Sequence, residues 1–324
     1  MQKTIRLKDW VEQWLGEILP TVVKPTTIQM YEDTMKRHIL PGLGDECLAD
    51  ISSEKVKDWL QKLSKTVVPG TQNGQMTEGS IRNTLSVLSG CLRDAQKQGL
   101  IACNPCKDIG WVLEPKNLTK SQEWLNEEEI RELMPQLASY QDQDGYPLGL
   151  GFQLVLYTGI TLSEASALRW QDVDLEKEVL YIRSFLAFQH GAEESGDPRY
   201  EVEELVGRKN REVPVPTFLI RQLKELKQEY EPAEESFVLS RSEKEPMSLD
   251  RMRKALSRRA ASCGMEKVTP RMLRDTYAMR AVKAGASSDM IAELMGFASS
   301  KQVIRRYMPM RMENKRELIN KMYQ

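Results

Sequence analysis

The chain has 324 residues, more than one compact domain usually needs, so we expect two domains. Hydrophobic residues make up 40% of it and charged residues 29%, an ordinary globular composition that excludes wholesale disorder. No run approaches the length of a membrane span, and the first residues contain no apolar signal-peptide core, which predicts a cytoplasmic protein. Five cysteines, an odd number, argue against a disulfide framework, and two histidines leave little room for a His-based zinc site or catalytic triad.

Charge is unevenly distributed along the chain. The formal total is -1, which taken by itself argues against a nucleic-acid partner. Residues 117–250 carry 14 Lys/Arg and 27 Asp/Glu, whereas residues 251–324 carry 17 and 6. A region this basic suits a polyanion, because each neutralised phosphate releases counterions. A solvated basic face that pairs with the acidic middle of the chain is the other interpretation, and charge does not separate the two.

The amino-terminal part is predicted to form a small all-helical bundle. Apolar residues recur at helical spacing over residues 4–19, 51–63 and 80–99, with Ser80 as the predicted start of the last helix. Pro25 opens a further helix in the same part of the chain. The predicted boundaries are 1–110 for this helical domain, 111–123 for a linker and 124–324 for a second domain.

The second domain is predicted to be mostly helical with a small sheet. Asn126 is a good N-cap with Glu129 three residues on, so a helix is expected to start there. Residues 179–188 and 212–215 are predicted strands, separated by an acidic loop over residues 189–204. The fold class is therefore mainly α with a small β-sheet, an all-helical domain followed by an α+β domain. Further helices are expected over residues 152–157, 219–230, 249–263, 270–284 and 288–295.

Two short motifs are better explained by turns than by chemistry. Cys103 and Cys106 form a CxxC in a helical domain, with no strand before it and no second ligand pair at zinc spacing. Asp172 and Asp174 fall at a helix-to-strand turn, where aspartate is common as a turn former. No phosphate-binding glycine loop is present, so nucleotide binding has no support and no metal site is predicted.

Three segments of the second domain stand out for their arginines, a tyrosine and helix breaks. Residues 157–170 read YTGITLSEASALRW. Residues 269–278 read TPRMLRDTYA, where the proline suits a first helical turn and Arg271 and Arg274, three apart, share one helix face. Residues 293–307 read ELMGFASSKQVIRRY and end on a tyrosine that follows two arginines.

With these segments the chain resembles the tyrosine recombinases, also called the phage integrase family, over nearly its whole length. The amino-terminal bundle looks like the core-binding domain of that family, and the layout resembles its two-domain members. The segment TGITLSEASALRWQDVD is similar to the family box around its first catalytic arginine, and REVPVP to the strand after its hairpin lysine. TPRMLRDTYA resembles the His-x-x-Arg box, and LMGFASSKQVIRRY the Leu-Gly-His box with the nucleophile that follows it.

The resemblance implies transesterification of a phosphodiester in double-stranded DNA, with no metal or other cofactor. In that reaction a tyrosine hydroxyl attacks phosphorus, and a 3′-phosphotyrosyl bond conserves the energy of the broken linkage. A phenol is a weak nucleophile at neutral pH, so a base or a positive field must assist it. Guanidinium forks suit the charge on the nonbridging oxygens, and a lysine typically protonates the leaving oxygen. The assembly implied is a homo-oligomer, a tetramer, on DNA, and no membrane partner is expected.

The family's functional residues carry over position by position. Tyr307 matches the nucleophile and Arg274 the second catalytic arginine. Lys209 is the candidate for the hairpin lysine, with Arg208 as the alternative. Arg271 stands where histidine is usual and is the hypothetical source of a second guanidinium. The positions that depart from the pattern are Thr161 for the first arginine, Phe297 for a histidine or tryptophan, and Asp275 where a second histidine often follows.

The departures leave two hypotheses for function. One absent oxyanion donor typically costs about 10²–10³ in rate, and a threonine does not replace a guanidinium fork. The chain is therefore either an integrase with a remodelled active site or a pseudo-recombinase that binds DNA without cutting it; a helical scaffold for proteins only is least favoured. Phosphate contacts are expected from Arg208, Arg251, Arg253, Lys254, Arg258, Arg259, Arg305 and Arg306.

Overall fold

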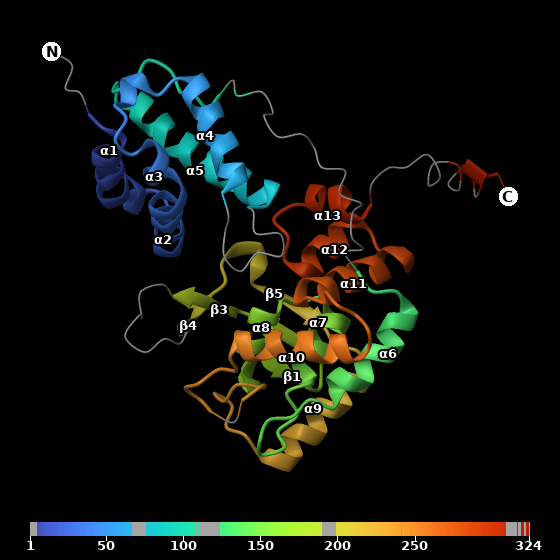
Figure 1. Cartoon of the computed structure of the whole chain (residues 1–324). Helices are drawn as coiled ribbons and strands as arrows, with labels where there is room; N and C mark the ends of the chain where they lie inside the picture. The colour runs from blue at the N-terminus through green and yellow to red at the C-terminus, as the bar shows by residue number, and fades with distance from the viewer. Residues whose placement is uncertain are drawn as a thin grey trace. The chain divides into compact units, whose positions relative to one another are not determined.

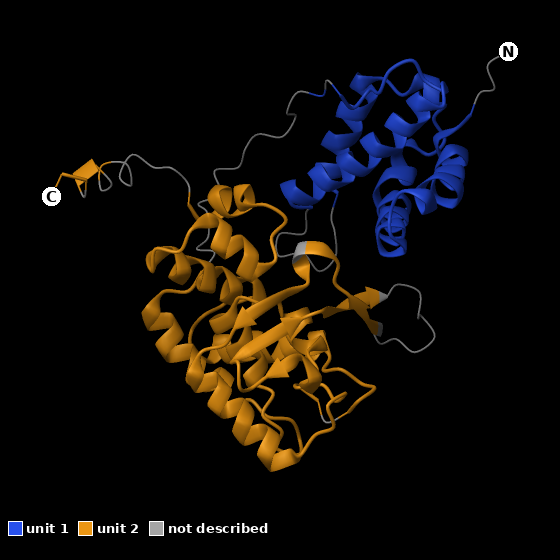
Figure 2. Ribbon diagram, turned by 180° about the vertical axis from the view of Figure 1, so that it is seen from behind, with its two compact units in different colours: residues 1–119 blue, residues 120–324 orange. Residues whose placement is uncertain are grey.

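The computed structural model describes residues 5–66, 76–107, 109, 124–189, 199–240 and 242–308, and in the last segment residues 316, 319, 320, 322 and 323. The chain separates into two compact units, Met1–Thr119 and Lys120–Gln324 (Figure 2). The predicted linker, 111–123, lies outside the described residues. Each unit contains its own hydrophobic core. No helix in the described part of the chain is both long and apolar enough to cross a membrane.

Unit 1 is all-helical, as predicted. Trp10 Nε1 donates to the carbonyl of Cys91 at 3.2 Å, which fixes the first helix of the unit to the last. Ser52 caps the helix that was expected over residues 51–63, whereas the last helix begins before Ser80, because Thr77 caps it. The helical elements are α1 (Leu7–Gln13), η1 (Trp14–Ile18), η2 (Leu19–Thr21), α2 (Pro25–Thr34), η3 (Met35–Ile39), α3 (Leu40–Leu43), η4 (Leu48–Asp50), α4 (Ser53–Lys65) and α5 (Glu78–Lys97).

The CxxC cysteines lie in a turn after α5. Cys103 and Cys106 are free thiols, the first exposed and the second half-buried. Burial raises the pKa of the Cys106 thiol to about 12. A reactive thiol needs a lowered pKa, so this environment favours the structural interpretation of the motif.

Unit 2 combines helices with two small antiparallel sheets. Its elements are α6 (Glu127–Ala138), α7 (Leu150–Thr158), α8 (Leu162–Ala167), η5 (Trp170–Asp172), β1 (Val173–Asp174), β2 (Val179–Ile182), β3 (Ser184–Gln189), β4 (Arg199–Glu204), η6 (Gly207–Lys209), β5 (Arg211–Pro214), α9 (Thr217–Tyr230), α10 (Leu249–Ser262), α11 (Pro270–Lys283), α12 (Ser288–Met295) and α13 (Ser300–Tyr307). The sheets have the strand orders β1-β2-β5 and β3-β4. Within this unit α11, α12 and α13 gather at one end and α9 lies at the other (Figure 1).

The strands differ from the sequence-based expectation in two ways. The expected single strand over 179–188 is divided at Arg183 into β2 and β3, which join different sheets. The expected loop over 189–204 contains β4, which pairs with β3 from Ser184 opposite Glu204 onward. The β4 sequence, RYEVEE, is too acidic to read as a buried strand. In the two-stranded sheet Glu201 and Glu204 are exposed and Glu203 is half-buried, so the carboxylates reach solvent.

The core of unit 2 surrounds α7, whose residues are nearly all buried. The capping box predicted at Asn126 is present: Asn126 accepts from the Glu129 amide at 2.9 Å, and the Glu129 carboxylate accepts from the Asn126 amide at 2.7 Å. Behind this start, the Leu125 amide donates to the hydroxyl of Thr276 in α11 at 2.9 Å. The beginning of the unit is therefore fastened to the helix that carries Arg271 and Arg274.

Candidate active site

A small cavity lies where the amino-terminal end of α8, the turn η6, helix α11 and the end of α12 meet. It encloses about 190 Å³. Three positions predicted from the sequence line it together: Thr161, Lys209 and Arg274. The remaining lining residues are Ser163, Glu164, Phe185, Leu205, Met295 and Gly296. We refer to this space as the catalytic cavity.

Arg274 is held at the junction of two helix ends. Its Nε donates to the Gly159 carbonyl at 2.8 Å, and its Nη2 donates to the Met295 carbonyl. These carbonyls belong to the last turns of α7 and α12, where backbone acceptors lack partners within the helix. Gly159 has φ +72°, and a Cβ there would lie 2.4 Å from the Tyr277 ring, so glycine is required. Burial lowers the pKa of the Arg274 guanidinium, and the charge of Glu164 opposes that shift.

Thr161 stands where the resemblance predicts an arginine, and it serves as the N-cap of α8. Its Oγ1 accepts from the Glu164 amide at 3.1 Å, while the Glu164 carboxylate accepts from the Thr161 amide at 2.6 Å. Its hydroxyl also lies 3.1 Å from that of Ser163. The cavity therefore contains a pair of neutral hydroxyls at this position in place of a guanidinium.

A buried ion pair beside the cavity was missed by the sequence analysis. Arg211 Nη1 and Nη2 donate to the two carboxylate oxygens of Glu164 at 2.9 and 3.2 Å, and their side chains are 4% and 8% exposed. Burial by itself raises the pKa of Glu164, but the hydrogen bonds and charge of Arg211 outweigh it and leave the pKa lowered. Arg211 Nε also donates to the Leu294 carbonyl at 2.8 Å. The signal available in the sequence was the capping-box spacing between Thr161 and Glu164.

The Arg211–Glu164 pair also explains the glycine that ends α12. Gly296 has φ +66°, and a Cβ there would lie 2.8 Å from Arg211 Nη1. The residue therefore needs glycine both for its backbone conformation and for the close approach of the guanidinium. In this way the ion pair sets how the chain leaves α12 toward Phe297.

Tyr307 is the last residue of α13, and its hydroxyl is bound by a carboxylate. The Tyr307 side chain is 5% exposed, and its Oη donates to Asp275 Oδ1 at 2.5 Å. Burial raises the pKa of the Tyr307 phenol, and the hydrogen bond to Asp275 raises it further. Arg306 donates two hydrogen bonds to the same carboxylate, from Nε at 3.2 Å and from Nη2 at 2.5 Å. Arg271 approaches it from outside, with Nε 3.7 Å from Asp275 Oδ2.

Phe297 links the Arg274 side of the site to the Tyr307 side. The Arg274 guanidinium carbon lies 5.1 Å from the centroid of the Phe297 ring. The Tyr307 ring centroid lies 6.3 Å from the same centroid. The structure thus brings Arg274 and Tyr307, which are far apart in the sequence, against one aromatic ring.

The predicted hairpin cation lies on η6. Lys209 is exposed and lines the catalytic cavity, and its carbonyl accepts from Arg211 Nη1 at 3.0 Å. The Arg208 side chain lies outside the described part of the chain. Of the two candidates for the hairpin lysine, the structure therefore describes the side chain of Lys209 alone.

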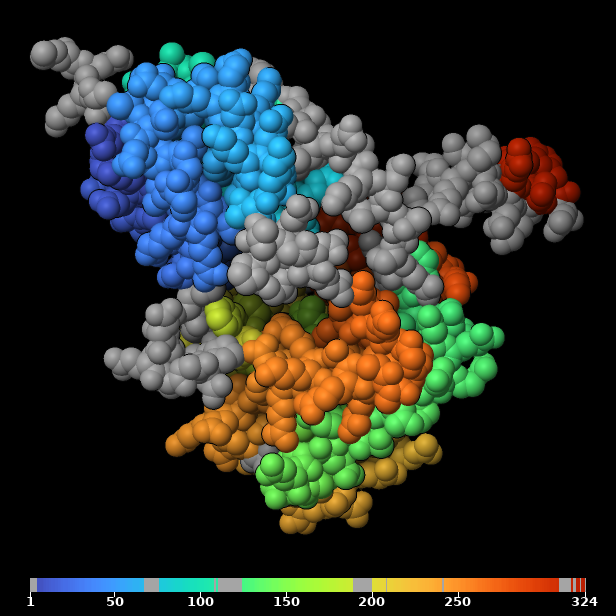
Figure 3. All heavy atoms as spheres, in the orientation of Figure 1, coloured from blue at the N-terminus to red at the C-terminus, as the bar shows by residue number. Residues whose placement is uncertain are grey.

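The basic residues of α10 fall into two groups. Arg251, Lys254 and Arg258 are exposed, and the atoms of α10 form much of the orange face of unit 2 in Figure 3. Arg253 is engaged, because Nη1 donates to Asp250 at 3.0 Å and to the Tyr200 hydroxyl at 3.3 Å. Arg259 lies over the Tyr140 ring, 4.8 Å from its centroid. The two remaining predicted contacts differ as well: Arg305 is exposed, whereas Arg306 binds Asp275.

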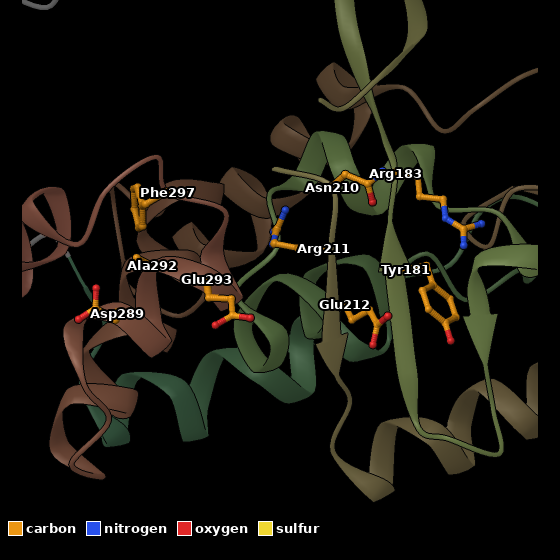
Figure 4. A pocket seen from close by; sticks show the side chains of 9 residues that line it. All are labelled: Tyr181, Arg183, Asn210, Arg211, Glu212, Asp289, Ala292, Glu293 and Phe297. Carbon is orange, nitrogen blue, oxygen red and sulfur yellow. The ribbon is translucent and has the colours of Figure 1, made fainter. Parts of the chain in front are cut away.

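A larger cavity of about 860 Å³ opens next to the site. Figure 4 shows its side chains coming from α12 on one side and from the strands on the other. Arg211 and Phe297 line it, so it adjoins the ion pair and the aromatic ring described above. Its other lining residues are Tyr181, Arg183, Asn210, Glu212, Asp289, Ala292 and Glu293.

Comparison with known families and curated proteins gives matches over both units. The phage integrase family model matches residues 123–314, and the model of the phage integrase N-terminal SAM-like domain matches residues 6–64. A tyrosine recombinase XerC-like protein of Caldanaerobacter subterraneus subsp. tengcongensis is 27% identical over 232 residues, 68% of this chain and 55% of that protein. A tyrosine recombinase of Thermosipho africanus is 24% identical over 83% of this chain and 84% of its own length. The chain thus spans little more than half of the first of these relatives.

Solved structures with the same fold include integrases in complex with DNA. The Tn1549 transposon integrase in complex with transposon right end DNA has a TM-score of 0.80 at 16% identity. The match covers 99% of this chain and 100% of the integrase chain. A lambda integrase dimer bound to a COC′ core site has a TM-score of 0.67 at 18% identity, covering 95% of this chain and 97% of its own. At these identities the likeness establishes the fold, mainly helical with small antiparallel sheets, as the sequence predicted.

Proposed function

Because the chain belongs to the phage integrase family, we propose that it breaks and rejoins double-stranded DNA at specific sites, with Tyr307 forming a 3′-phosphotyrosyl intermediate. One observation carries the proposal: Arg274 and Tyr307 lie against the same Phe297 ring. An anion-binding guanidinium next to a tyrosine hydroxyl is the minimum that phosphoryl transfer to tyrosine requires.

Each residue of the site has a role in the proposed reaction. The Arg274 fork stabilises the negative charge that collects on the nonbridging oxygens of the phosphate. Lys209, which lines the same cavity, protonates the departing 5′ oxygen. Thr161 supplies a neutral hydroxyl where the family resemblance predicts a guanidinium, and Arg271 is the proposed second guanidinium. The active site is in this sense remodelled.

A pseudo-recombinase that holds DNA without cutting it is the second candidate. Two observations favour it: Thr161 is occupied as a helix cap, and the Tyr307 hydroxyl is bound to Asp275 rather than free. Both candidates predict DNA binding, so only a covalent product separates them.

The test uses a pool of duplexes with a randomised stretch and a nick inside it. Cleavage next to the nick releases a short fragment, so the covalent protein–DNA product cannot be religated and accumulates. We expect an adduct on denaturing gels with the wild type and with the control Tyr181→Phe, and none with Tyr307→Phe. Adduct formation by Tyr307→Phe would refute the role of this residue, and bound DNA without adduct from the wild type would establish the pseudo-recombinase.

Assembly on DNA is part of the proposal. The fold is shared with a lambda integrase that was solved as a tetramer bound to a Holliday junction. Strand exchange joins two duplexes, and each of the four exchanged strands needs its own nucleophile, so we propose that this chain also acts as a homotetramer on DNA.

The exposed cations of α10 are proposed phosphate contacts. Replacing Arg251, Lys254 and Arg258 with glutamine should make the plot of log affinity against log salt less steep. The magnitude of the slope should fall by about 1 for each phosphate contact that is lost. Arg253 and Arg259 are excluded from the variant because they contact other side chains. The matched control neutralises Arg221 and Lys224 of α9, the helix at the end of unit 2 away from α11, α12 and α13, and should leave the slope unchanged. Equal slopes for the α10 variant and the wild type would refute the assignment.

A further inference from the structure

Asp275 follows Arg274 directly and points its carboxylate at the nucleophile. It is 3% exposed, and Oδ1 accepts the Tyr307 hydroxyl at 2.5 Å. A buried carboxylate is unfavourable unless charges and donors compensate it. Here the fork of Arg306 donates to both oxygens and the Arg271 Nε lies 3.7 Å from Oδ2, so the buried carboxylate has the donors and charges that it needs.

In the described part of the chain, the other groups around the Tyr307 hydroxyl offer no comparable base. Phe297, which packs on the tyrosine ring, has no acceptor atom. The tyrosine side chain is almost fully buried, so bulk water has little access to its proton. Among the described residues, Asp275 is the acceptor of the one hydrogen bond that Tyr307 Oη donates.

We propose that Asp275 is a catalytic residue that takes the phenolic proton as Tyr307 attacks the phosphodiester, an inference that rests on the function proposed above. The Oη–H proton moves to Asp275 Oδ1, the bond between Oη and phosphorus forms, and the bond from phosphorus to the 5′ oxygen breaks. The 5′ oxygen leaves with a proton from Lys209. In the rejoining step the proton returns from Asp275 to Oη as the phosphotyrosyl bond breaks.

The timing of this transfer follows from the acidity of the Tyr307 phenol. At rest the proton stays on the phenol, because burial and the hydrogen bond raise the pKa of Tyr307. As Oη bonds to phosphorus it loses electron density and its proton becomes acidic, so a carboxylate that is a weak base at rest becomes a sufficient acceptor. A proton acceptor that is already 2.5 Å away needs no rearrangement to act at that moment.

Arg306 then has a role different from the phosphate contact expected from the sequence. Its Nε and Nη2 both donate to Asp275, and its side chain is 25% exposed. A bidentate fork fixes the plane of the carboxylate, and with it the direction of the Oδ1 lone pair toward Tyr307. We assign Arg306 as a positioning residue that acts through Asp275.

Asp275→Asn tests the proposal, because asparagine keeps the size and an acceptor oxygen for Tyr307 but does not take its proton. On the duplex selected from the nicked pool, the rate of adduct formation should fall about 10²–10⁴-fold, the usual contribution of a general base. DNA affinity should stay close to wild type, and the unfolding temperature should fall modestly, because Arg306 loses the charge of its partner but is itself 25% exposed and can be solvated. A ring-fluorinated tyrosine at position 307, whose phenol ionises at lower pH, should restore most of the lost rate in this variant and change the wild type little.

Each outcome of this experiment either supports or overturns the role proposed for Asp275. Asp289→Asn, the same change at an exposed aspartate of α12, is the matched control and should react like the wild type. An Asp275→Asn rate equal to wild type would overturn the inference and leave the proposed function standing. A slow variant that fluorination does not rescue would show that Asp275 only positions the tyrosine. No adduct from the wild type on any duplex of the pool would overturn the proposed function and this inference together.

Discussion

Replacing Lys209 with alanine should slow adduct formation on the selected nicked duplex by about 10²–10⁴-fold, the usual contribution of a general acid. Without a proton donor the 5′ oxygen would leave as an alkoxide, a strong base that is a poor leaving group at neutral pH. Lys209 lines the catalytic cavity with Arg274, close to where the phosphate must lie for Arg274 to stabilise it. The measurement is the single-turnover rate of covalent product formation.

A sulfur leaving group turns this loss into a test of mechanism. A duplex with a 5′-bridging phosphorothiolate releases a thiol, which ionises near pH 8.5 and needs no proton to depart. On that substrate Lys209→Ala should react as fast as the wild type, and so should the control Lys224→Ala on the oxygen substrate. Asp275→Asn should stay slow on sulfur, because its defect lies on the nucleophile. If Lys209→Ala is slow on both substrates or fast on both, Lys209 is not the general acid.

The separate boxes of the site were recoverable from the sequence because each is a short local pattern. Pro270 starts the helix that carries Arg274, and glycines end the helices on which its carbonyl partners lie. Local spacing could predict that these segments exist, and the family resemblance predicted their order. Neither could predict the position of Phe297, which replaces a histidine or tryptophan of the family pattern. Arg274 and Tyr307 both lie against its ring.

What the sequence did not reveal depends on contacts between distant segments. The density of arginines on α10 predicted a uniform basic face, but Tyr200 and Tyr140, from other elements, engage Arg253 and Arg259. Arg306 was likewise expected to contact phosphate. In the structure α13 packs against α11, and Arg306 binds Asp275. A single charged side chain carries no local signal of its partner, so helical periodicity predicts which face it occupies and not what it binds.

Arg211→Met should be among the most destabilising single changes in unit 2. Methionine fills similar space but leaves the Glu164 carboxylate buried without its partner, which typically costs about 3–5 kcal/mol. For a unit of this size that corresponds to an unfolding temperature lowered by roughly 6–20 °C. Arg253→Met is the matched control, because Arg253 and its partner Asp250 are 52% and 37% exposed, so this ion pair lies at the surface.

The pH dependence of this loss has a definite sign. In the wild type the pKa of Glu164 is lowered in the folded state, so its stabilisation is present above the unfolded pKa and is lost as pH falls through the folded one. Without Arg211 burial dominates and the folded pKa of Glu164 rises above the unfolded value, so the variant is penalised as pH rises. The difference in stability should therefore shrink between pH 7 and about pH 4, near the ordinary glutamate pKa. Adding Glu164→Gln to Arg211→Met removes the buried charge and should recover part of the loss at pH 7. A loss that is independent of pH and untouched by the second change would mean that Arg211 stabilises the unit by packing rather than by pairing with Glu164.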